Sequence, residues 1–106
     1  MKVVFDLEVE EYLSQLVDIL YDKEYFGLKE SAYQYVDALI DDIEYGIRNK
    51  SKKPAPTYFN RYGKNMSYAI FKKNDNTQWY VFFNRDDDIY YIRYIGNNHT
   101  CAQYLD

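Results

Sequence analysis

Residues 66–95 read MSYAIFKKNDNTQWYVFFNRDDDIYYIRYI, three runs rich in aromatic and β-branched residues with two polar turns between them. The runs are Met66–Lys73, Thr77–Arg85 and Ile89–Ile95, and the turns are Asn74-Asp75-Asn76 and Asp86-Asp87-Asp88. Such residues favour strands, and turns of this length join neighbouring antiparallel strands. The stretch therefore predicts an antiparallel meander.

Two helical segments precede this meander. Apolar residues recur every three or four positions in Leu7–Glu24 and in Lys29–Arg48, the period of a helix with one buried stripe. Asp6 is a candidate N-cap, and Gly27 lies where the chain must reverse. Lys2–Phe5 predicts a further short strand. The order β-α-α-β-β-β predicts an α+β fold, with a helical hairpin packed on one face of an antiparallel sheet.

The remaining segments fit one domain spanning 1–106. A chain of 106 residues has room for one core, and the basic, proline-punctuated stretch 49–56 indicates a connection rather than a boundary. Tyr58–Arg61 predicts a short edge piece of the sheet. The tail His99–Leu105 is expected to pair briefly or to turn helical.

The composition excludes several classes of protein. No apolar run approaches the roughly 18 residues of a membrane-spanning helix, and the N-terminal residues do not form a secretory signal. Cys101 is the only cysteine, so an intramolecular disulfide and a multi-cysteine metal site are excluded. These features lead us to expect a cytoplasmic protein without metal or cofactor.

The charge is divided unevenly along the chain. Residues 1–50 carry five Lys/Arg against twelve Asp/Glu, whereas residues 51–106 carry eight against five. The second half also holds most of the rings, and a basic, ring-rich surface is typical of nucleic-acid binding. The alternative is that acidic helices simply present solvated faces.

The strands predict a sheet with rings on both faces. Strict alternation divides the last strand into two sets, Tyr90, Ile92 and Tyr94 against Ile89, Tyr91, Arg93 and Ile95. Only one face can lie under the helical hairpin, so the other must meet a second molecule, a loop or stacked bases. A charge in mid-strand is unfavourable in a core, so we expect Arg93 and Tyr91 on the face away from the helices.

Few residues offer reactive chemistry. His99 is the only histidine and could move a proton near neutral pH, although a lone loop histidine is more often an ordinary surface residue. His99 and Cys101 alone make a poor metal site, and no oxyanion motif accompanies the thiol. The acidic turn 86–88 lacks the spacing of a calcium loop.

Two segments carry a resemblance to a known family. Thr77–Phe83, TQWYVFF, and Tyr91–His99, YIRYIGNNH, follow a helical hairpin in an order that resembles the RelE/ParE superfamily of type II toxins, in particular its HigB-like branch. The resemblance implies a cytoplasmic toxin neutralised by a cognate antitoxin. Many members cut messenger RNA on the ribosome, whereas the ParE branch poisons DNA gyrase.

The resemblance also implies roles for single residues. Cleavage by attack of a ribose 2′-hydroxyl on the next phosphate needs a cation, a proton carrier and a platform for the base. Arg93 matches the family's strand arginine and would bind the phosphate. His99 would be the acid/base, and Tyr104 would stack on a base or share the proton transfer. The accompanying RNA-binding residues would be Arg61, Lys64, Arg85 and Tyr91.

Three hypotheses stay open at this point. The first is a ribosome-dependent endoribonuclease, although its acidic pI of about 4.9 differs from the basic character of most family nucleases. The second is a non-catalytic binding member of the same fold, either a gyrase inhibitor or a decayed toxin. The third is a homodimer that buries the second aromatic face. Convergence of Arg93, His99 and Tyr104 on one basic cleft would favour the enzyme, and a histidine that points elsewhere would favour binding alone.

Overall fold

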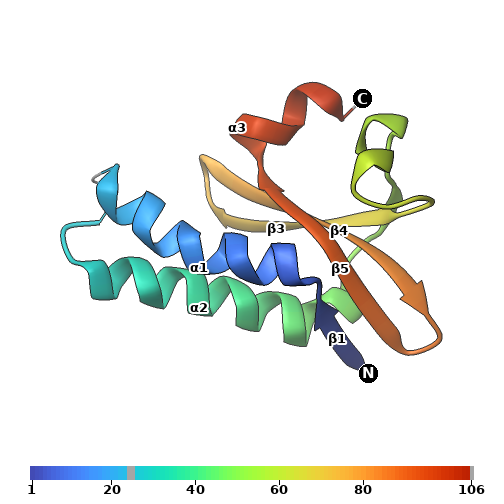
Figure 1. Ribbon diagram of the computed structural model, residues 1–106, viewed down its shortest axis with the longest axis horizontal. Helices are drawn as coiled ribbons and strands as arrows, with labels where there is room; N and C mark the ends of the chain where they lie inside the picture. The colour runs from blue at the N-terminus through green and yellow to red at the C-terminus, as the bar shows by residue number, and fades with distance from the viewer. Residues whose placement is uncertain (24–25, 106) are drawn as a thin grey trace.

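The computed structural model describes residues 1–23 and 26–105. A helical pair packs against a sheet (Figure 1), and this sheet has five strands. The strands are β1 (Lys2–Phe5), β2 (Lys53–Pro54), β3 (Ser67–Asn74), β4 (Thr77–Asp86) and β5 (Ile89–Asn97). The helices are α1 (Leu7–Asp22), α2 (Lys29–Gly46) and α3 (Asn98–Cys101), with 3₁₀ helices η1 (Ile47–Asn49), η2 (Thr57–Arg61) and η3 (Ala102–Tyr104). The predicted α+β class and the β-α-α-β-β-β order are confirmed.

The sheet is mixed rather than wholly antiparallel. Its strand order is β1-β5-β4-β3-β2, and β3, β4 and β5 form the predicted antiparallel meander. However, β1 pairs in parallel with β5, from Lys2 opposite Ile89 to Phe5 opposite Ile92. Parallel strands need a long connection, which the helical hairpin and the other strands supply here. The pattern within Lys2–Phe5 carries no information about a partner so far along the chain.

The ends of several elements differ from the predictions. Tyr58–Arg61 lies in η2 and not in an edge strand; the edge is β2, where Pro54 pairs with Ser67. Proline has no N–H to donate, and it is therefore tolerated at such an edge. The predicted end of the first helix, Glu24, lies outside the described residues, and the second helix passes into η1 at Ile47. The helical turn predicted for the tail is confirmed by α3 and η3.

The helices bury one face of the sheet in what we call the first core. The apolar stripes of α1 and α2 pack against rings and aliphatic side chains of the central strands. Its sheet residues are Ala69, Phe71, Trp79, Val81, Phe83, Tyr90, Ile92 and Ile95. The Trp79 indole N–H donates a 3.0 Å hydrogen bond to the hydroxyl of Tyr35 on α2, which ties the helix to the sheet.

A β-bulge interrupts β5. Phe83 lies opposite Ile92 and Phe82 lies opposite Tyr94, so Arg93 is an extra residue without a partner across the strands. The strict alternation predicted for this strand is therefore wrong beyond Ile92. The bulge moves Tyr94 to the face away from the helices and brings Ile95 into the first core.

The chain itself covers the second face. The second core consists of Phe59, Met66, Tyr80, Phe82 and Cys101, with η2 and the α3–η3 turn lying over the sheet. The Phe59 ring stacks on the Phe82 ring at 4.2 Å, and the Tyr62 ring stacks on the Tyr94 ring at 3.8 Å. Of the three coverings that the sequence allowed, a loop covers these rings. None of the described helices is long and apolar enough to cross a membrane.

Candidate functional site

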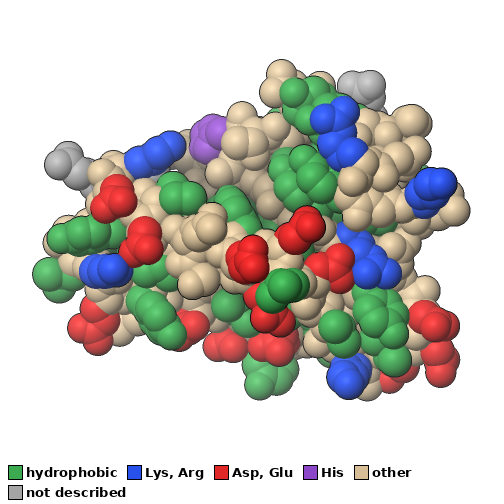
Figure 2. All heavy atoms as spheres, viewed as in Figure 1, with side chains coloured by type: hydrophobic (Ala, Val, Ile, Leu, Met, Phe, Trp, Pro, Cys, Tyr) green, Lys and Arg blue, Asp and Glu red, His purple; other side chains and the backbone are tan. Residues whose placement is uncertain are grey.

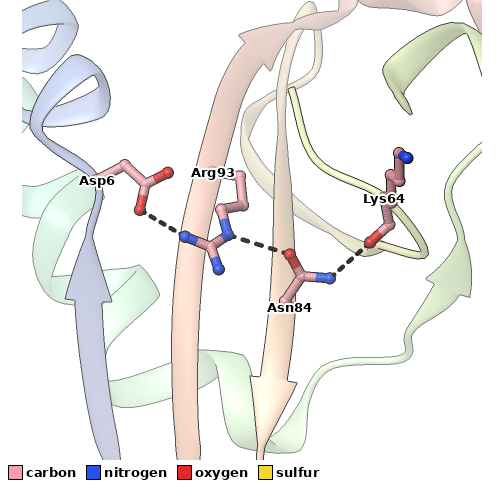
Figure 3. Close-up of polar contacts among 4 residues, drawn as sticks. All are labelled: Asp6, Lys64, Asn84 and Arg93. Atoms are coloured by element: carbon pink, nitrogen blue, oxygen red, sulfur yellow. Dashed lines mark hydrogen bonds and ion pairs between the residues drawn. The ribbon is translucent and has the colours of Figure 1, made fainter. Parts of the chain in front are cut away.

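The bulged Arg93 is the centre of a polar network (Figure 3). Its Nη1 lies 3.0 Å from the Asp6 carboxylate, and its Nε donates to the Asn84 side-chain oxygen at 3.0 Å. The Asn84 amide in turn donates to the backbone carbonyl of Lys64 at 2.9 Å. The side chain of Arg93 is 33% exposed. The network therefore fixes the guanidinium at the surface. The other terminal nitrogen, Nη2, takes no part in these hydrogen bonds.

Asp6 explains how the strand tolerates a charge. It occupies the predicted N-cap position of α1, and its backbone carbonyl accepts from the N–H groups of Val9 and Glu10. Its side chain makes no capping hydrogen bond and turns instead to Arg93. The carboxylate is thus the counterion of an arginine 87 positions away.

Rings surround the exposed edge of Arg93. The guanidinium carbon lies 5.2 Å from the centre of the Tyr91 ring, within the range of a cation–π contact. A cavity of about 290 Å³ opens beside it. The lining residues are Glu8, Val9, Tyr12, Tyr62, Arg93, Tyr94, Ile95 and Thr100.

Two tyrosines of this cavity, Tyr12 and Tyr94, stay protonated at neutral pH. Burial, followed by the nearby Cys101 thiol, raises the pKa of Tyr94 and also that of Tyr12. Their hydroxyl groups can therefore donate hydrogen bonds but cannot act as bases. The only carboxylate in the lining belongs to the exposed Glu8.

A second cluster lies on η2 and the C-terminal turn. The Tyr58 and Tyr104 rings stack at 3.6 Å and 4° apart in plane, and the Arg61 guanidinium lies 3.9 Å from the centre of the Tyr58 ring. Tyr58 therefore covers one face of the Tyr104 ring. The chain runs from this cluster directly to Gly63, whose backbone lies against the Arg93 side chain.

His99 and Arg85 lie elsewhere. The His99 backbone N–H donates to the Asn97 side chain, and its own side chain lines a different cavity of about 410 Å³ that Trp79 and Tyr35 share. Arg93 does not line that cavity. Arg85 donates from Nε to the Asp87 carbonyl and lies 5.2 Å from the Tyr90 ring, a ring of the first core.

The structure thus brings together some of the predicted site residues. Arg93, Tyr91 and the Lys64 backbone share one network, and Arg61 and Tyr104 share the adjacent stack. His99 and Arg85 belong to neither group. The sequence analysis did not identify Asp6 or Asn84 as residues of the site. The signal for Asn84 was a single amide directly after the run Trp79–Phe83, whose five residues are all buried in the structure.

Other chemistries find no support in the geometry. The described residues contain no group of three or more His, Cys, Asp or Glu side chains able to hold a metal ion. Burial raises the pKa of the Cys101 thiol, which reduces the thiolate needed for nucleophilic attack. Polar contacts by Arg93 and aromatic stacking are therefore the chemistry that this surface offers.

The charges are also separated in space. Figure 2 shows acidic side chains gathered over the helical hairpin, whereas Arg61, Lys64 and Arg93 border the second core. The unequal distribution of acidic and basic residues along the sequence is therefore also an unequal distribution over the surface. Comparisons of the chain with family models, with curated proteins and with solved structures found no match.

Proposed function

We propose that the protein is the toxin of a type II toxin–antitoxin pair of the RelE/ParE kind, a cytoplasmic endoribonuclease that cuts messenger RNA on the ribosome and is neutralised by a cognate antitoxin. The observation that carries this proposal is the surface around Arg93. There, a partly exposed arginine, the stacked Arg61 and several tyrosines lie near the second core, next to the first turn of α1.

Arg93 supplies the cation for the chemistry. A guanidinium binds a phosphate through paired N–H groups and stabilises the charge that develops during cleavage. Nη2 lies outside the network, so it can meet a phosphate while Asn84 holds Nε in place. The Tyr58–Tyr104 stack and Tyr91 offer rings for the neighbouring bases.

Proton transfer is the weaker part of this site. His99, the acid/base implied by the resemblance, lines another cavity. Glu8 lines the cavity beside Arg93. Its carboxylate would accept the proton of the attacking 2′-hydroxyl and return it to the 5′-oxygen as the bond from phosphorus to that oxygen breaks. In this version of the mechanism, Arg93 binds the phosphate and Glu8 takes the part assigned to His99.

A second function, non-catalytic binding on the same scaffold, is favoured by two observations. Arg93 is already paired with Asp6 at 3.0 Å, and the sole histidine lies away from it. A gyrase inhibitor or a decayed toxin that keeps only antitoxin binding needs neither a free arginine nor a proton carrier.

Inducible expression in a bacterial host tests the proposal. We expect the wild-type protein to arrest growth and to leave messenger RNA with new 5′ ends inside translated codons. Arg93→Ala should relieve the arrest, and Arg48→Ala, an exposed arginine of η1, should leave it unchanged at equal expression. Growth by cells that contain soluble, folded wild-type protein would contradict the toxin proposal.

Two further variants separate the candidate functions. Glu8→Gln should slow messenger RNA cleavage, and His99→Ala should not. Arrest without cleaved messenger RNA would overturn the nuclease and support the non-catalytic function. Loss of cleavage in His99→Ala alone would return the proton transfer to the histidine.

A further inference from the structure

Exposed apolar side chains concentrate on the helical hairpin. Among the described residues, the large hydrophobic side chains with substantial exposure are Met1, Leu7, Ile19, Tyr21, Leu28, Tyr33 and Tyr45. All of them except Met1 lie on α1, on α2 or next to them. The second face of the sheet is covered by η2 and the C-terminal turn, whereas none of the described elements covers the outer surface of the hairpin. Exposed apolar side chains that gather on one element in this way are typical of an interaction site.

A groove of about 560 Å³ runs along this outer surface between the two helices. Its floor is apolar and is formed by Phe5, Leu13, Val17, Val36 and Ile40. Tyr33 stands beside it with 58% of its surface exposed. The apolar floor spans about one turn of each helix, and the full lining extends from Glu10 to Asp18 on α1 and from Lys29 to Glu44 on α2.

The rim of the groove is acidic. Glu10 borders it on α1, and Asp37 and Glu44 border it on α2. Lys29 is the one basic residue of the lining, and it forms a 2.9 Å ion pair with Asp18. Glu10, Asp37 and Glu44 form no ion pair within the described part of the chain. Figure 2 shows acidic and apolar side chains alternating over this region.

We propose that this groove binds an amphipathic helix of a partner protein, with Lys or Arg on both sides of its apolar stripe. Two helices side by side leave a groove that a third helix fills by ridge-into-groove packing. The apolar stripe would cover the floor and bury mainly Tyr33, Phe5 and Ile40, because Leu13, Val17 and Val36 are already buried in the first core. The flanking cations would meet Glu10, Asp37 and Glu44. The inference concerns a surface apart from Arg93 and holds whether or not the protein cleaves RNA.

The negative charge of the rim disfavours binding of other candidate partners in this groove. Phosphates of RNA and of an anionic membrane would meet like charge at this surface. A second copy that docked through its own hairpin would likewise place acids against acids. Helices with an acidic or neutral flank would gain the apolar contact but no ion pairs, so the cationic helix is the occupant that matches both properties.

The test is a selection of binders from a displayed library. The library contains helices of about 18 residues with a fixed leucine stripe, and each flanking position is Lys or Glu in equal amounts. Selection against the whole purified protein should enrich Lys over Glu at the flanking positions. One selected peptide is then synthesised, and its Kd is measured at physiological salt, where distant charges are screened.

Matched variants locate the bound peptide. Glu10→Lys with Asp37→Lys should weaken binding about tenfold, and Glu11→Lys with Glu30→Lys, on the same helices outside the groove, by no more than about twofold. Tyr33→Ala should weaken binding about tenfold, while Tyr45→Ala, which is 80% exposed but not in the groove, should not. Circular dichroism confirms that each variant is folded.

Several results would overturn the proposal. These are a library that yields no binder, flanks enriched in Glu or in neither residue, and a loss of affinity that is equal in Tyr33→Ala and Tyr45→Ala. A protein that is dimeric in solution and becomes monomeric in Tyr33→Ala would assign the groove to a second copy instead.

Discussion

The two cores differ in the kind of chain that builds them. In the first core, two regular helices lay aliphatic stripes on the sheet, and the buried positions follow a 3.6-residue period. In the second core, an irregular segment and a short C-terminal turn lay aromatic rings on the opposite face. As a result, β4 is buried on both sides over five consecutive residues, Trp79–Phe83. A small domain can thus bury the middle of a central strand on both faces with long helices on one side only.

The difference has a consequence for the candidate site. The helices that cover the first core have solvated, acidic outer faces. Half-buried rings and the Arg93 network instead lie at the edge of the second core. Irregular chain over a sheet leaves side chains such as Tyr62 and Arg61 at its margin, where they can meet a ligand. The proposed RNA surface is therefore the border of the second core.

The largest expected effects come from two adjacent phenylalanines of β4. Phe83 is buried in the first core and Phe82 in the second, and both are at most 2% exposed. We expect Phe83→Ala and Phe82→Ala each to lower the free energy of unfolding by about 3–5 kcal/mol, measured by urea denaturation. A loss below about 1 kcal/mol for Phe82→Ala alone would mean that the second core is a loose cover.

Gly96→Ala should have the next largest effect. A Cβ at this position would collide with the Cys101 thiol, a residue of the second core. We expect a loss of about 1–3 kcal/mol from overpacking. Cys101→Ala in the same chain should recover part of that loss, since it removes the colliding sulfur. Equal losses in the single and double variants would show that the clash is not with this thiol.

Alkaline pH should weaken the second core. Burial raises the pKa of Tyr94 and of Cys101 above their ordinary values of 10.0 and 9.0. Above those ordinary values the unfolded chain loses protons that the folded chain still holds, so stability is complete below about pH 9 and declines as pH rises. The decline is at most about 1.4 kcal/mol per pH unit for each group. Urea denaturation from pH 7 to 10.5 should show a shallower decline in Cys101→Ala.

The smallest effect on stability is expected for Asp6→Asn. The Asp6–Arg93 pair is about one-third exposed, so its loss should cost no more than about 1 kcal/mol. The same change removes the negative charge next to Arg93, so a short labelled RNA should bind more tightly than to the wild type. Asp42→Asn, which breaks the Asp42–Lys73 pair instead, is the control. Unchanged RNA binding in Asp6→Asn would separate Arg93 from the RNA surface.

The regular parts of the fold were predictable from local patterns. Helical periodicity located α1 and α2, and the two polar turns delimited β3, β4 and β5. The parallel pairing of β1 was not predictable, because its partner β5 lies far along the chain. The bulge at Arg93 was not predictable, because an extra residue within a ring-rich strand leaves no local pattern. The segment that covers the second face could not be identified from the sequence either, because η2 has no periodic pattern.

The candidate site was predictable only in part. Arg93 was identified because a mid-strand charge needs a face away from the helices, and the network with Asn84 agrees with that argument. Its counterion Asp6 lies at the other end of the sequence and was predicted to serve as a helix cap. His99 and Arg85 were assigned by resemblance and by charge, which do not determine which side of the sheet a turn residue faces.

The pairing of β1 with β5 also determines when folding of the sheet can be completed during protein synthesis. The ribosome makes Lys2–Phe5 long before Ile89–Ile92, and the earlier segment cannot pair in the sheet until the later one has emerged. The helical hairpin can form early from local contacts, whereas closing the sheet must await a contact that spans most of the chain. Arg93 meets Asp6 only at that final stage, so a partly made chain has hairpin but no assembled site.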